Sequence, residues 1–88
     1  MAEPVRRSDA VAWVGSEDRV VVVRLDDLAA DPLVLADSAA AVWLAVDDGA
    51  SAEEVVLRVA AAYDVDVEVV RAGVEAFLVQ ARDQRILT

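Results

Sequence analysis

Hydrophobic positions along the chain change their spacing near residue 37. Before it, apolar residues come in short runs over 11–15, 20–25 and 33–36, separated by polar turns. Because β-branched side chains favour an extended backbone, each of these Val-rich or Leu-rich runs predicts a strand. After residue 37, apolar residues recur at intervals of three and four, the period of a helix with one buried face. We expect three strands followed by three helices.

The run from Val20 to Leu25 is the strongest strand signal in the chain. Four consecutive valines begin it, and an apolar run without alternation indicates burial on both faces, as in a central strand. Pro32 precedes the third run, Leu33–Ala36. Proline is tolerated at the first residue of a strand and in edge strands, so we expect the third strand at an edge. Residues 1–10 show no periodicity, which predicts a flexible N-terminal arm.

Side chains that can accept a hydrogen bond from a free backbone N–H stand at the start of each helical segment. The candidates are Asp37 or Ser38, Ser51 with Glu54 as a capping box, and Asp66. Gly49 is expected to end the first helix, because glycine adopts the left-handed conformation at little cost. The expected buried positions are Val42, Trp43 and Val46 in the first helix, Val55, Val56, Val59 and Tyr63 in the second, and Val70, Val74, Phe77 and Ala81 in the third.

The composition fits one small acidic domain. The chain has 88 residues, 58% of them hydrophobic, and a formal net charge of −9 at pH 7. Proteins bind nucleic acids through clusters of Lys and Arg, whereas the basic residues of this chain are few and scattered. No apolar run approaches the roughly 20 residues of a membrane-spanning helix, and residues 1–10 lack the apolar centre of a signal peptide. We therefore expect a cytoplasmic protein with neither nucleic-acid nor membrane partners.

The residue types that most often carry catalysis or bind metals are missing. The absence of His and Cys removes the commonest general base, the commonest metal ligand and the thiolate sites of structural zinc. Paired carboxylates at 26–27, 47–48 and 53–54 stand at turns and helix starts, where neighbours in sequence do not face each other. We expect a non-catalytic recognition or adaptor protein that uses no metal ion and no cofactor.

Two other functions agree with parts of this pattern. An acyl or peptidyl carrier protein attaches its pantetheine arm to a serine at a helix start, and Ser38 occupies such a position. Carriers have Asp-Ser-Leu there, however, and Ala39 follows Ser38 in this chain. A winged-helix DNA-binding regulator also combines three helices with a small sheet. It needs a basic recognition helix, and the third expected helix carries more acidic than basic residues.

The segment from residue 33 to residue 78 contains an ordered set of short motifs. They are Leu35, Asp37-Ser38-Ala39-Ala40, Val42-Trp43-Leu44, Asp48-Gly49, Ser51-Ala52-Glu53-Glu54, Tyr63-Asp64-Val65, Val70, Val74 and Phe77-Leu78. In this order they resemble the PqqD-like family of peptide-recognition domains, and the resemblance extends from about Pro4 to Leu87. Two positions depart from the family's pattern. Gly73 stands where the family often has Asp, and Arg85 stands where it tends to have Gly.

The resemblance implies a winged helix-turn-helix-like α+β domain over residues 11–88, with a three-stranded antiparallel sheet followed by three helices. Members of this family bind the leader segment of a ribosomally synthesised precursor peptide. They present it to a separate modifying enzyme or leader peptidase. A lasso-peptide pathway is favoured, because such pathways commonly use a free domain of this size. A radical S-adenosylmethionine pathway is the next choice.

The resemblance also implies where the leader binds: it adds as a strand beside the third strand and lies against the third helix. The unpaired edge of Leu33–Ala36 would receive it. The third helix offers two sides of its core stripe, Val67, Arg71 and Leu78 on one, and Val69, Gly73 and Ala76 on the other. We favour the first, because it joins apolar contact with a charge for an acidic leader residue. The predicted peptide-binding residues are Leu33, Val34, Leu35, Ala36, Val67, Val70, Arg71, Val74 and Leu78.

Overall fold

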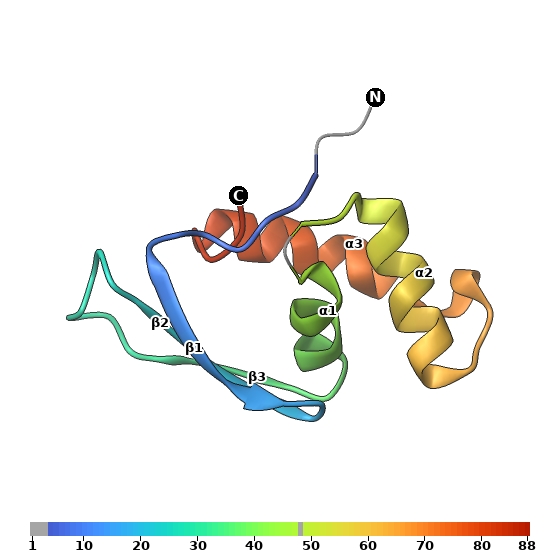
Figure 1. Ribbon diagram of the computed structural model, residues 1–88, viewed down its shortest axis with the longest axis horizontal. Helices are drawn as coiled ribbons and strands as arrows, with labels where there is room; N and C mark the ends of the chain where they lie inside the picture. The colour runs from blue at the N-terminus through green and yellow to red at the C-terminus, as the bar shows by residue number, and fades with distance from the viewer. Residues whose placement is uncertain (1–3, 48) are drawn as a thin grey trace.

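A computed structural model describes residues 4–47 and 49–88 of the chain. It confirms three strands followed by three helices, an α+β fold (Figure 1). The strands are β1 (Val11–Ser16), β2 (Arg19–Arg24) and β3 (Leu33–Ala36), and the helices are α1 (Ser38–Val46), α2 (Ala52–Tyr63) and α3 (Val67–Asp83). The sheet is antiparallel with the order β1-β2-β3. The predictions of a central second strand and an edge third strand are therefore confirmed.

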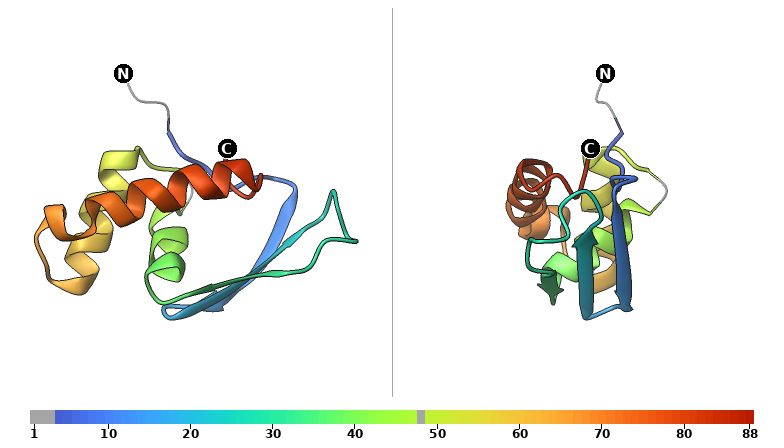
Figure 2. Two further views of the ribbon diagram at one scale, coloured as in Figure 1. Left: turned by 180° about the vertical axis from the view of Figure 1, so that it is seen from behind. Right: turned by 90° about the vertical axis from the view of Figure 1, so that its left-hand side faces the viewer.

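The helices cover one face of the sheet. Helix α1 contacts β2, β3, α2 and α3, and it lies between the sheet and the other two helices (Figure 2). Val20 and Val22 of β2 are fully buried beneath it, whereas Val21 and Val23 are only half-buried. The expectation that β2 is buried on both faces was therefore wrong, because no helix packs on the second face of the sheet in the described part of the chain. The unbroken valine run reflects strand propensity rather than two-sided burial.

The core consists of apolar residues from β2, β3 and the three helices, together with residues before β1 and after α3, and it includes Trp43. Trp43 is completely buried, and the ring of Trp13 stands edge-on to it with the ring centroids 6.0 Å apart. The predicted stripe of α1 is confirmed, since Val42 and Val46 are buried with Trp43. Tyr63 differs from its prediction because it is 47% exposed. It is the last residue of α2, beyond the end of the helix's buried stripe.

The segment before β1 is packed against the domain where the structure describes it. Val5 is 1% exposed and pairs with Ala50, and the amide of Ser8 donates to the carbonyl of Ile86. Residues 1–3 lie outside the described residues. This contact differs from the flexible arm expected over residues 1–10. The sequence shows no periodicity there because a single buried valine and scattered backbone bonds hold the segment.

The structure confirms the predicted side-chain cap of α2 but shows none at α1 or α3. The hydroxyl of Ser51 accepts a hydrogen bond from the amide of Glu54 at 3.1 Å, so the predicted cap of α2 is confirmed. Asp37 and Asp66 occupy the N-cap positions of α1 and α3, but neither side chain makes a cap bond. Asp37 has φ 54° and ψ −120°, which is not the extended conformation in which a side chain reaches back to the first turn.

Candidate functional site

The free edge of β3 presents two residues with unused backbone groups. The register pairs Val20 with Leu35 and Val22 with Leu33, and the amide of Asp37 donates to the carbonyl of Asp18 at 3.0 Å. Hydrogen-bonded and non-hydrogen-bonded pairs alternate in an antiparallel ladder. The Asp37 bond therefore fixes which β3 residues bond to β2.

Because the pairs alternate from Asp37 along the strand, Leu33 and Leu35 form the backbone hydrogen bonds to β2. The N–H and C=O groups of Val34 and Ala36 therefore point away from β2. No strand pairs with this edge in the parts of the chain that the structure describes. The side chains follow the same period of two. Leu35 is 8% exposed and faces the core, whereas Val34 is 54% exposed. β3 therefore packs against the core through Leu35, and its outer backbone groups lie at an open edge of the sheet.

An apolar groove opens at the start of α1, the helix that follows β3 in the chain, and no residue of β3 lines it. It has a volume of about 380 Å³, near the lower end of the range typical of ligand pockets, which starts at roughly 300 Å³. The start of α1, the C-terminal half of α2 and one side of α3 form its walls. The lining residues are Ser38, Ala39, Val42, Val59, Tyr63, Val69, Val70, Gly73, Val74, Ala76, Phe77 and Gln80. None of them is charged, although the protein as a whole carries a net charge of −9.

The structure brings only some of the predicted helix residues to this groove. Val70 and Val74 line it, and both belong to the predicted set. Leu78 is 4% exposed and belongs to the core, while Val67 is half-buried against the core. Neither lines the groove, and neither does Arg71.

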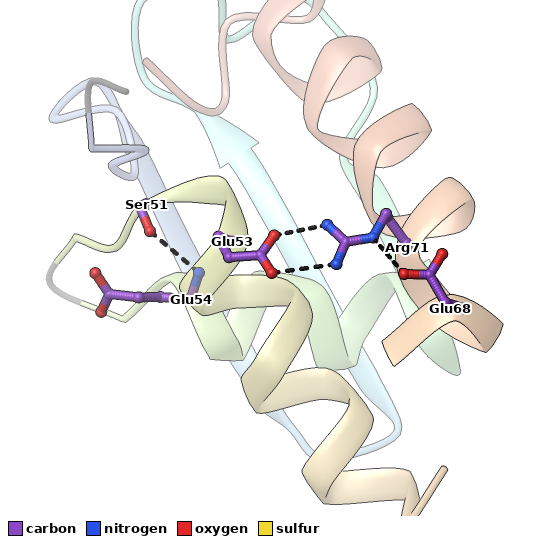
Figure 3. A network of polar contacts seen from close by, with 5 residues as sticks. All are labelled: Ser51, Glu53, Glu54, Glu68 and Arg71. Atoms are coloured by element: carbon purple, nitrogen blue, oxygen red, sulfur yellow. Dashed lines mark hydrogen bonds and ion pairs between the residues drawn. The ribbon is translucent and has the colours of Figure 1, made fainter. Parts of the chain in front are cut away.

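Arg71 is engaged by carboxylates on the far side of α3 from the groove. Its guanidinium forms two hydrogen bonds to Glu53 of α2, Nη1 to Oε2 at 2.6 Å and Nη2 to Oε1 at 3.1 Å (Figure 3). Its Nε donates to Glu68 at 3.3 Å. The hydrogen bonds from Arg71 lower the pKa of Glu53, and Glu53 in turn raises the pKa of Arg71 above its ordinary value. An acidic leader residue would have to compete with two carboxylates for this cation.

The side of α3 that was not favoured carries the groove. Val69, Gly73 and Ala76 all line it. The helical period identified both sides of the core stripe, but it could not tell which side α2 covers. One signal was present in the sequence, because Gly73 and Ala76 are small and leave space that larger residues would fill.

The described residues contain no group of three or more His, Cys, Asp or Glu side chains placed to hold a metal ion. No helix in residues 4–47 and 49–88 has the length and apolar character needed to cross a membrane. The exposed carboxylates of Glu53 and Glu68 are occupied by Arg71. The site therefore offers a ligand two kinds of contact: backbone hydrogen-bond donors and acceptors at the edge of β3, and the apolar surface of the groove.

Comparison with known proteins agrees with this geometry. The family model for coenzyme PQQ synthesis protein D (PqqD) matches residues 19–87, most of the chain. The chain belongs to the PqqD family. The family match begins at β2, so β1 lies before the matched region. A search of curated proteins found no match.

A solved structure of TbiB1 in complex with the TbiA(beta) leader peptide is similar to this PqqD-family chain. The two share 27% sequence identity, and the alignment covers 93% of each chain with a TM-score of 0.78. This alignment covers a larger share of the chain than the family model, which matches residues 19–87.

Proposed function

We propose that this PqqD-family protein binds the leader segment of a ribosomally synthesised precursor peptide by adding it as a fourth strand beside β3. The open edge at Val34 and Ala36 is the single observation that carries the proposal. Backbone pairing supplies affinity that is independent of sequence, and side-chain pockets supply selection. The similarity to TbiB1, whose structure holds a leader peptide, supports the same ligand class for this chain.

The groove beside the edge supports the selection step. Its α3 wall runs from Val69 to Gln80, a rise of about 16 Å at 1.5 Å per residue. An extended peptide advances about 3.3 Å per residue, so this wall is as long as about five residues of an extended peptide. Alternate side chains of that strand turn toward the helices, as Leu33 and Leu35 do.

We further propose that the protein acts as an adaptor for a separate enzyme. Binding the leader raises the effective concentration of the attached core peptide at an enzyme that also binds this domain. A leader peptidase of a lasso-peptide pathway is our first choice of partner, and a radical S-adenosylmethionine enzyme is the second. The precursor is made by ribosomes, so we propose that this recognition takes place in the cytoplasm.

The carrier-protein and DNA-binding alternatives gain nothing from the structure. Ser38 is the exposed first residue of α1, but a sheet precedes the helices where a carrier has a helical bundle. The proposed DNA-reading helix, α3, holds Arg71 in ion pairs with Glu53 and Glu68. Leader binding therefore remains the function that the site supports best.

The edge of β3 gives a direct test in Val34→Pro. Proline at this position removes an N–H that points away from β2, so the β2–β3 ladder keeps its hydrogen bonds and only the bond to the peptide is lost. We expect about a tenfold or greater loss of affinity for a fluorescently labelled peptide with the leader sequence of the cognate precursor, measured by fluorescence anisotropy.

Val11→Pro is the matched control. Val11 is the first residue of β1, at the opposite edge of the sheet, and it does not belong to the groove. Its variant should bind the leader as the parent does. Equal affinity of the parent and Val34→Pro would place the site elsewhere. Leu35→Asp is not a clean alternative, because Leu35 is buried and a charge there would unfold the domain.

A further inference from the structure

Gly73 occupies a position in the middle of α3 that has no internal reason to be glycine. A Cβ built on Gly73 meets no heavy atom within 4 Å, and the residue has an ordinary helical conformation. Glycine in a helix interior costs about 1 kcal/mol of stability relative to alanine. The fold therefore bears a cost at Gly73 that neither packing nor backbone conformation explains.

The open space over Gly73 belongs to the groove. Gly73 and Ala76 form the part of the α3 wall with the smallest side chains, and Ala39 of α1 lies on the opposite wall. Val70 and Val74 flank Gly73 on the same helix and also line the groove. The recess that results is bounded by apolar groups and contains no charged side chain. A charged group placed there would lose its hydration without gaining a partner.

We propose that Gly73 is a specificity-determining residue, whose missing side chain leaves a recess for one large uncharged side chain of the bound leader, either aliphatic or aromatic. The inference rests on the proposed function. Hydrogen bonds to Val34 and Ala36 hold the leader backbone at the edge of β3, so the groups that reach α3 are its side chains. A side chain at residue 73 would occupy the space that the leader side chain needs.

Substitutions at Gly73 can test the recess without disturbing the packing of the fold. Because its Cβ position is open and its backbone is helical, Gly73→Leu is expected to keep the fold and to raise the Tm by a few degrees. Ala72→Leu is the matched control, since it adds the same side chain to an exposed neighbour that does not line the groove. Gly73→Asp introduces a negative charge into the recess instead of bulk.

A random library of displayed 12-residue peptides serves as the probe, selected separately on the parent protein and on each variant. The parent should enrich peptides with a large apolar residue at one fixed position. Gly73→Leu should bind the parent's consensus peptide at least about tenfold more weakly and select small residues at that position. Gly73→Asp should select Lys or Arg there, and Ala72→Leu should give the parent's consensus.

The possible results distinguish a failure of the Gly73 inference from a failure of the proposed leader binding at β3. If the parent enriches no peptide, or if Val34→Pro does not weaken binding of the consensus peptide, the proposed function and the inference both fail. If the consensus depends on Val34 but is the same for the parent, Gly73→Leu and Gly73→Asp, only the inference fails. A loss of binding in Gly73→Leu together with a lowered Tm would also overturn the inference, because it would show damage to the fold.

Discussion

At the scale of single residues, the ion pair between Glu53 and Arg71 gives a pH-dependent property that can be measured. Hydrogen bonding to Arg71 lowers the pKa of Glu53 from its ordinary 4.5. A carboxyl whose pKa is lower in the folded state contributes stability above its ordinary pKa and loses that contribution as the pH falls through the folded-state pKa. Arg71→Met should therefore raise the pKa of Glu53 toward 4.5, as followed by NMR titration of its carboxyl carbon.

Arg82→Met is the control for this titration. Arg82 lies in the last turn of α3, where its Nε donates to the carbonyl of Thr88, and this variant should leave the pKa of Glu53 unchanged. The stability difference between the parent and Arg71→Met should also shrink as the pH falls from about 6 to about 3. A Glu53 pKa that is the same in the parent and in Arg71→Met would refute the ion pair.

The role of Arg71 also shows what could not be predicted from the sequence at this scale. Glu53 is 18 positions away along the chain, and nothing in the helical period of either segment indicates that they meet. The pattern of α3 correctly placed Val74 and Ala81 in the core, but it assigned Leu78, which is buried, to one side of the core stripe. It could not assign one side to α2 and the other to the groove, because that choice depends on how α2 and α3 pack.

At the scale of elements, the cap of α2 is a local interaction with a predictable cost. Ser51 accepts the amide hydrogen of Glu54, and its backbone has the extended conformation that such a cap requires. Ser51→Ala should lower the free energy of unfolding by about 1 kcal/mol. That loss corresponds to roughly 4–8 °C in Tm for a domain of this size, and urea unfolding measures it directly.

Ser38→Ala is the matched control for the cap, because Ser38 starts α1 without a side-chain cap bond and is exposed. Its unfolding midpoint should stay within about 0.5 kcal/mol of the parent's. Equal losses in Ser38→Ala and Ser51→Ala would contradict the capping assignment. The sequence predicted the cap of α2 but not the absent cap of α1. A serine or aspartate at a helix start shows that a side-chain cap can form there. Whether it forms depends on the backbone angles, and those of Asp37 are not the extended ones that a cap requires.

At the scale of the whole molecule, the arrangement of the sheet determines where a peptide can bind. Hydrophobic spacing predicted the order of the elements, and Pro32 before a short strand predicted the edge position of β3. It did not predict the packed segment at Val5–Ser8, or that no helix among residues 4–47 and 49–88 covers the second face of the sheet. Those features depend on contacts between distant parts of the chain, which local periodicity does not encode.

The central claim is that the outer edge of β3 is free to pair with a peptide strand, and amide hydrogen exchange tests this claim most directly. In the free protein, the amides of Leu33 and Leu35 should exchange slowly because they bond to β2, and those of Val34 and Ala36 should exchange fast. Adding the leader peptide at saturation should slow Val34 and Ala36 selectively. If these two amides are already protected in the free protein, or stay fast in the complex, the leader does not add to the sheet as a strand beside β3.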